Sequence, residues 1–220
     1  MKSPVFAIVT LCVCATPAFA ETFSQPSAVV ELFTSQGCPS SPKANKVVSK
    51  LDETDADVLT LSYGVNYWDY LGWKDTTGHE ASAERQRLYD QALDSGLYTP
   101  MVVVSGQFHG SKMKAGSTIP HTVEANLRLA RQSGELCLVG KLPEGAVLAI
   151  VDYHPGVQTV EVKGGQNRGK TVEITNTVTD VNYKSWKGQM MCGFYPKAGL
   201  AVLAHDAETS AIIGAARFEP

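Results

Sequence analysis

The first half of the chain alternates between short, almost wholly apolar runs and longer segments in which apolar residues recur with a helical period. Such apolar runs are typical of strands that are buried on both faces of a sheet. They occur at residues 28–33, 58–65 and 101–104, and residues 107–110 form the expected hairpin partner of the third run. We therefore expect a sheet that is covered by helices on both faces.

Three segments show the helical period. Residues 43–52 place Ala44, Val47, Val48 and Leu51 on one face. Residues 82–93 place Leu88, Tyr89 and Leu93 inward, opposite Glu84, Arg85 and Arg87. Residues 119–131 fit a third amphipathic helix, with Val123, Leu127 and Ala130 inward.

Beyond Gly134 the pattern changes to short strands separated by Gly, Pro and Asn. These runs are residues 137–139, 147–152, 157–162, 171–177, 200–203 and 211–216. Regularly spaced short strands favour an antiparallel β-rich lobe over further strand–helix units. The pattern thus predicts an α/β domain at residues 21–133, followed by a β-rich C-terminal lobe at residues 134–220.

The N-terminal 20 residues have the features of a secretory signal peptide. Lys2 precedes an apolar stretch, and Ala18-Phe19-Ala20 supplies small residues at the −3 and −1 positions of a cleavage site before Glu21. The apolar run is far shorter than the roughly 20 residues that span a bilayer. We therefore expect a periplasmic or secreted protein without a membrane anchor.

Composition and charge exclude several classes of protein. The chain has 220 residues, of which 44% are hydrophobic and 19% charged, so a globular core is expected rather than disorder. The formal net charge is −3, from 19 Lys and Arg against 22 Asp and Glu. This balance lacks the basic surface that nucleic-acid binding requires.

Removal of the signal peptide leaves three cysteines, which are Cys38, Cys137 and Cys192. In an oxidising compartment an odd number leaves one thiol without an intramolecular partner. A Cys137–Cys192 disulfide within the β-rich region leaves Cys38 free, as a reactive site requires. A bridge from Cys38 to either of the others is the alternative, and it would supply a distant resolving thiol.

Cys38 is the leading candidate for chemistry. It lies between the strand at 28–33 and the helix at 43–52, where unpaired backbone N–H groups favour an anion and lower the pKa of a thiol. The alternative is a cysteine that fills space beneath the strand end. A strand, a turn and a cysteine at a helix start form the arrangement found in thioredoxin, whose second cysteine position is here occupied by Ser41.

Two further features belong to the same candidate site. Pro100 precedes the strand at 101–104, and we expect the Thr99–Pro100 peptide bond to be cis. Tyr67, Trp68 and Trp73 follow the second strand, at the edge of the sheet where α/β proteins bind ligands. These aromatic residues wall a ligand groove over the thiol or, alternatively, pack the insert against the sheet.

Several segments together resemble one known family. These segments are residues 30–45, 65–75, 84–86, 98–103 and 165–169. The sequence resembles a family of exported, thioredoxin-like proteins of Gram-negative bacteria that is classified as a domain of unknown function. The usual motif of that family is Glu-Leu-Phe-Thr-Ser-Gln-Gly-Cys-Ser-Ser-Cys-Pro. The resemblance implies a thioredoxin-like fold, whereas Ser41 replaces the second motif cysteine and argues against dithiol chemistry.

No cofactor is indicated by the sequence. The five histidines, at positions 79, 109, 121, 154 and 205, show no metal-binding spacing. Three hypotheses about function remain: a monothiol thiol–disulfide oxidoreductase acting on protein or small-molecule thiols and disulfides, a binding protein without turnover, and a metal carrier using Cys38 and a distant histidine.

Overall fold

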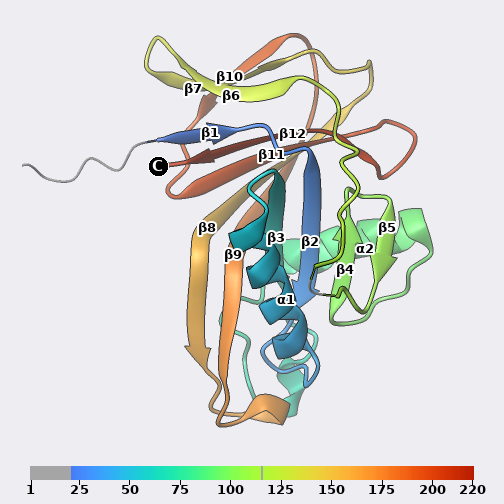
Figure 1. Cartoon of the computed structure of the whole chain (residues 1–220), viewed down its shortest axis with the longest axis vertical. Coiled ribbons are helices and arrows are strands. Elements are labelled where there is room, and N and C mark those ends of the chain that lie inside the picture. Colours follow the sequence, from blue (N-terminus) through green and yellow to red (C-terminus); the bar gives the residue numbers. More distant parts are fainter. Residues whose placement is uncertain (1–20, 115) are drawn as a thin grey trace, which may run out of the picture.

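The computed structural model describes residues 21–114 and 116–220, and within them the chain forms two sheets and two α-helices. The large sheet has nine strands in the order β1 (Thr22–Ser24), β12 (Ile212–Glu219), β11 (Gly199–His205), β8 (Val147–Glu161), β9 (Thr171–Ser185), β3 (Val58–Gly64), β2 (Ala28–Thr34), β4 (Met101–Val104) and β5 (Phe108–Gly110). The small sheet consists of β10 (Met190–Phe194), β7 (Glu135–Gly140) and β6 (Leu127–Gln132). It lies across one end of the large sheet (Figure 1).

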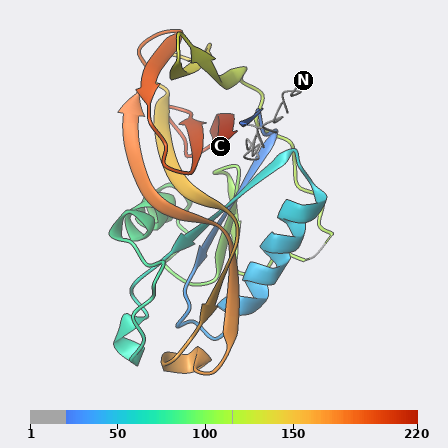
Figure 2. The same cartoon turned by 90° about the vertical axis from the view of Figure 1, so that its left-hand side faces the viewer.

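The helices α1 (Ser41–Thr54) and α2 (Glu80–Leu93) confirm two of the predicted helices, and they cover opposite faces of the large sheet (Figure 2). Side chains of β2 point alternately to the two faces of the sheet, so the strand contributes to the core on both sides. Val30 and Leu32 pack with Val48 of α1, whereas Val29 and Phe33 pack with Tyr89 of α2. The predicted hairpin is also present, since β4 and β5 are antiparallel neighbours.

The predicted fold class, a thioredoxin-like α/β domain with a C-terminal β-rich lobe, is wrong. Strands make up 44% and helices 17% of the described chain, and one mixed sheet unites strands from both halves. Ser62 of β3 pairs in parallel with Thr177 of β9. The second-half strands therefore share the core of β2 and β3, and the predicted boundary at 133/134 falls in the turn between β6 and β7.

The predicted helix at 119–131 is also wrong, because its second half is strand β6. Leu127 and Leu129 are buried and Arg128 is exposed, which is the two-residue alternation of a strand. The leucines pack with Leu136 and Leu138 of β7. The apolar residues of this segment fit a helical spacing in the sequence, but in the structure they form the buried face of a strand.

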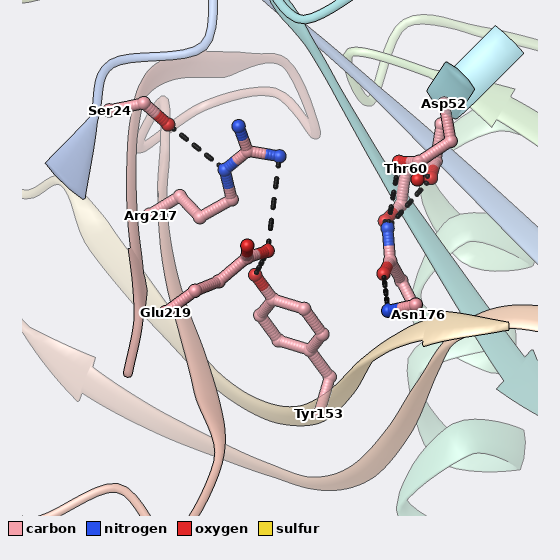
Figure 3. A network of polar contacts seen from close by, with 8 residues as sticks. Ser24, Asp52, Thr60, Tyr153, Asn176, Arg217 and Glu219 are labelled. Atoms are coloured by element: carbon pink, nitrogen blue, oxygen red, sulfur yellow. Dashed lines mark hydrogen bonds and ion pairs between the residues drawn. The ribbon is translucent and has the colours of Figure 1, made fainter. Parts of the chain in front are cut away.

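Polar side chains hold β9 against the first half of the chain (Figure 3). The Asn176 amide donates to the Asp52 carboxylate of α1 at 2.8 Å and to the Thr60 carbonyl of β3 at 3.1 Å, and it accepts from the Gly156 N–H at 2.8 Å. Nearby, Tyr153 of β8 donates to Glu219 of β12 at 2.7 Å. These bonds connect strands that the chain order separates widely.

The predicted signal peptide, residues 1–20, lies outside the described residues. Within the part that the structure describes, no helix is both long enough and apolar enough to cross a membrane.

Candidate functional site

Cys38 lies in the turn that leads from β2 into α1, close to the predicted position. Its N–H donates to the Ser35 carbonyl at 3.2 Å, and its carbonyl accepts from the Ser41 N–H at 3.3 Å. Pro42 occupies the first turn of α1, where its missing N–H has no intrahelical partner to lose. The start of the helix thereby fixes the backbone on both sides of the cysteine.

The thiol is packed against the start of β4. Only 1% of Cys38 is exposed. Its Sγ lies 3.3 Å from the Ser40 Oγ and 3.5 Å from the Thr99 carbonyl oxygen. The Thr99–Pro100 peptide bond is cis, as the sequence predicts. The cis bond therefore begins at a residue that contacts Cys38, although Thr99 and Cys38 are 61 positions apart in the chain.

The surroundings of Cys38 favour its anionic form. Burial by itself raises the pKa of the thiol, but hydrogen bonds from Ser40, Ser41 and Thr99 outweigh burial, so the pKa lies below its ordinary value. The sequence predicts this direction from the start of the helix. The structure adds the side-chain hydroxyl groups.

The hydroxyl oxygens of Ser41 and Thr99 each accept a hydrogen bond from another residue. The Trp68 Nε1–H donates to the Thr99 Oγ1 at 2.7 Å, and the Ser35 N–H donates to the Ser41 Oγ at 3.4 Å. A hydroxyl oxygen that accepts one hydrogen bond still has its own hydrogen to donate. Trp68 and Ser35 are thus positioned to direct hydroxyl hydrogens toward the sulfur.

The three predicted aromatic residues have different places. Trp68 approaches the cysteine turn closely, since a Cβ on Gly37 would lie 3.0 Å from the Trp68 Cβ. Trp73 instead donates to the Gln36 Oε1 at 2.8 Å and packs on the hairpin of β8 and β9. Tyr67 is 37% exposed, and partial burial raises the pKa of its hydroxyl. Trp73 supports the turn, whereas Trp68 contacts the thiol's neighbours.

Asn167 closes the turn from behind and was missed by the sequence analysis. It belongs to η2 (Gly165–Asn167), is fully buried, and donates to the carbonyls of Gln36 at 2.8 Å and Cys38 at 2.7 Å. Figure 1 shows η2 at the end of the molecule where β2 meets α1. The segment 165–169, noted through the family resemblance, was the available signal.

Asp75 is a second residue that holds the cysteine turn. Its buried carboxylate accepts from the Gln36 N–H at 2.7 Å and the Ser35 hydroxyl at 3.1 Å, and also from the Thr77 N–H at 2.9 Å. Asp75 follows the short helix η1 (Asp69–Leu71). The aromatic insert is therefore tied to the cysteine turn by a carboxylate as well as by Trp73.

The disulfide prediction is confirmed. Cys137 of β7 and Cys192 of β10 lie opposite each other in the small sheet and are bonded. Cys38 is the free cysteine of the described chain. No group of three His, Cys, Asp or Glu side chains that could hold a metal ion occurs among residues 21–114 and 116–220.

The described residues define a mixed-sheet protein in which the free thiol of Cys38 is buried beside the cis Thr99–Pro100 bond. The chain belongs to the family described as "Protein of unknown function (DUF1223)", whose profile matches residues 29–198. The predicted membership of a family of unknown function is thus confirmed.

Two solved structures are similar to this chain. The chain resembles a protein from Agrobacterium tumefaciens solved by the Northeast Structural Genomics Consortium, with 28% identity and a TM-score of 0.67, over 89% of this chain and 95% of that one. It also matches HBP35 of Porphyromonas gingivalis with 15% identity and a TM-score of 0.48, over 88% of this chain and 74% of that one. No curated protein matches the chain.

Proposed function

We propose that the protein is a monothiol thiol–disulfide oxidoreductase that uses Cys38 and acts in the periplasm or outside the cell after residues 1–20 are removed. One observation carries the proposal. The Ser40 Oγ lies 3.3 Å from the Cys38 Sγ, and the adjacent Ser41 and Thr99 hydroxyls, which accept from the Ser35 N–H and the Trp68 Nε1–H, also lower the pKa of the thiol. Hydroxyls arranged in this way stabilise a thiolate, which is the nucleophile in disulfide exchange.

The reaction has two balanced steps. The Cys38 thiolate attacks one sulfur of a substrate disulfide, so a mixed disulfide forms and the other sulfur leaves as a thiolate. An external thiol then attacks the substrate sulfur of the mixed disulfide, so the Cys38 thiolate is released and a new disulfide forms between the external sulfur and that substrate sulfur. The proton of the external thiol goes to the thiolate that left in the first step, which is the reduced product. Ser41 cannot replace the external thiol, because a hydroxyl does not form a disulfide.

The first step requires that a substrate disulfide can reach the Cys38 sulfur. Only 1% of Cys38 is exposed, so the side chains that cover it must move before a disulfide can reach the sulfur. A small disulfide such as a glutathione mixed disulfide needs less movement than a folded protein. Substrates of this small class are therefore expected to react faster.

The test is reduction of a glutathione mixed disulfide by glutathione in the presence of the purified protein. We expect wild-type protein to accelerate the reaction and Cys38→Ser to reduce the rate to that of glutathione alone. A Cys38→Ser protein as active as wild type would contradict the proposal, and the intact Cys137–Cys192 disulfide in both proteins serves as the internal control.

A binding protein without turnover is the second candidate, and the burial of Cys38 favours it. In that case the wild-type and Cys38→Ser proteins are both inactive with disulfides, although both remain folded. Failure of wild type to form any mixed disulfide with excess oxidised glutathione would support this candidate over the first.

A further inference from the structure

A cavity separate from the thiol lies between α2 and the ends of β8 and β9. Its volume is about 690 Å³, which falls within the usual range for small-molecule sites. The loop at 206–211 and the turn between β4 and β5 complete its wall. Figure 2 shows α2 beside the curved strands β8 and β9.

One side of the cavity is apolar. It is formed by Leu88, Ala92 and Leu93 of α2 together with Val147 of β8. Leu88 is 47% exposed, although the helical pattern predicts it to be buried. Its position in the cavity wall explains why an apolar residue occupies this face of α2.

The other end of the cavity is polar and is built around Arg85, which is 2% exposed. Its Nε donates to the Glu31 carboxylate at 2.5 Å, and its Nη2 donates to the Tyr89 hydroxyl at 3.1 Å and to the His205 Nε2 at 3.2 Å. Its Nη1 donates to the Tyr183 hydroxyl at 3.2 Å. A guanidinium group has five N–H hydrogens, so this arrangement leaves one of them on Nη1.

Two hydrogen-bond donors remain unused at this end of the cavity. Tyr183 accepts from Arg85 and keeps its own hydroxyl hydrogen, and Nη1 keeps one N–H. His205 has no free nitrogen, because its Nδ1 donates to the Ser210 carbonyl at 2.8 Å. A ligand that engages both of these donors presents a hydrogen-bond acceptor to them.

The charges around the cavity favour an uncharged acceptor. Glu31 already neutralises Arg85, while Asp206 and Glu208 in the wall oppose an anion. Burial and the neighbouring guanidinium lower the pKa of His205 to about 4, so the imidazole is neutral near pH 7.

We propose that this cavity binds a small, uncharged amphipathic molecule, with its carbonyl oxygen at Arg85 and Tyr183 and its apolar part along Leu88, Ala92 and Val147. If the buried Arg85–Glu31 pair served only to hold α2 on the sheet, Arg85 would not need a hydrogen bond to the Tyr183 hydroxyl at the cavity wall. The guanidinium here reaches past Glu31 to Tyr183, which is itself partly exposed.

Three eight-carbon probes test the head group, namely octanamide, octanoate and octylamine, each titrated into the full-length protein and followed by amide chemical shifts. We expect octanamide to shift the signals of Gly106, Tyr183 and residues 207–211, and to bind at least roughly fivefold more tightly than either charged probe. Equal or tighter binding of octylamine or octanoate, or shifts that map elsewhere, would overturn the proposal.

A matched pair of variants tests the location. Ala92→Trp fills the cavity from an exposed position on α2, whereas Ala56→Trp places the same side chain at an exposed position after α1, away from the cavity. We expect octanamide binding to be lost in Ala92→Trp and unchanged in Ala56→Trp. Undiminished binding to a folded Ala92→Trp protein contradicts the assignment.

Discussion

At the scale of single residues, the sequence predicted which cysteine is free and where it lies. It also assigned Ser41, Thr99–Pro100 and Trp68 to the same site, but it did not predict the hydrogen bonds among them or the contact with Asn167. The spacing of Cys38 and Pro42 from the preceding strand is local information, and the position of the turn follows from it. Trp68, Thr99 and Asn167 meet Cys38 only through the tertiary fold. The hydroxyl network that lowers the pKa of the thiol could not be predicted from neighbouring positions alone.

Trp68→Phe is expected to raise the pKa of Cys38, because Thr99 loses the donor that orients its hydroxyl. The measurement is the alkylation rate of Cys38 as a function of pH. Trp73→Phe is the matched control, since Trp73 donates to Gln36 and not to a neighbour of the sulfur. The same pH midpoint in wild type and Trp68→Phe would show that Trp68 does not position Thr99.

At the scale of elements, helices α1 and α2 followed from the apolar period, whereas the inward face of α2 followed only in part. Tyr89 is buried as predicted, but Leu88 is exposed and Arg85 is buried. The pattern assigns Arg85 to solvent, because an arginine is rarely buried without a partner. Its partner, Glu31, lies 54 positions earlier on β2, so no local window contains the pair. Strand β6 was mistaken for a helix for the same reason, since the sheet that buries its leucines comes later in the chain.

Arg85→Met is expected to cost about 3–5 kcal/mol of unfolding free energy, because it leaves Glu31 buried without its cation. Arg87→Met on the same helix is the control. Its pair with Glu80 is exposed, so the change should cost less than about 1 kcal/mol. Urea unfolding measures both, and similar losses in the two variants would contradict the assigned role of the buried pair.

Asn167→Ala is expected to lower the unfolding free energy by about 2–4 kcal/mol, since the carbonyls of Gln36 and Cys38 both lose a buried donor. Gln166→Ala, at the exposed neighbouring position, serves as the reference and should change stability by less than about 0.5 kcal/mol. If denaturant unfolding gives the same loss of unfolding free energy for the two variants, η2 does not hold the cysteine turn.

At the scale of the whole molecule, most strands were predicted in the right places but their pairing was not. Two halves of different character suggest separate units, yet β9 joins β3 and both halves share one core. The period of a strand reports which residues are buried and not which strand lies beside it. The small sheet, by contrast, agrees with the predicted disulfide within the β-rich region.

Replacing both Cys137 and Cys192 by alanine is expected to lower stability by about 4 kcal/mol, the chain-entropy value for a loop closed over 55 residues. Urea unfolding, followed by circular dichroism, measures the stability of the wild-type and double-variant proteins. Because the small sheet packs on β12, we expect a single transition in both proteins. Unchanged stability in the double variant would show that the bridge constrains the unfolded chain very little.

The central claim is that the hydroxyl neighbours of Cys38 lower the pKa of its thiol. The most direct test is the rate of iodoacetamide alkylation of Cys38 in the folded protein between pH 5 and 10, followed by mass spectrometry. A lowered pKa predicts a midpoint below the value of a free cysteine, which is about 8.5. A midpoint at or above about 8.5 would contradict the account, because burial would then dominate over the hydroxyl network.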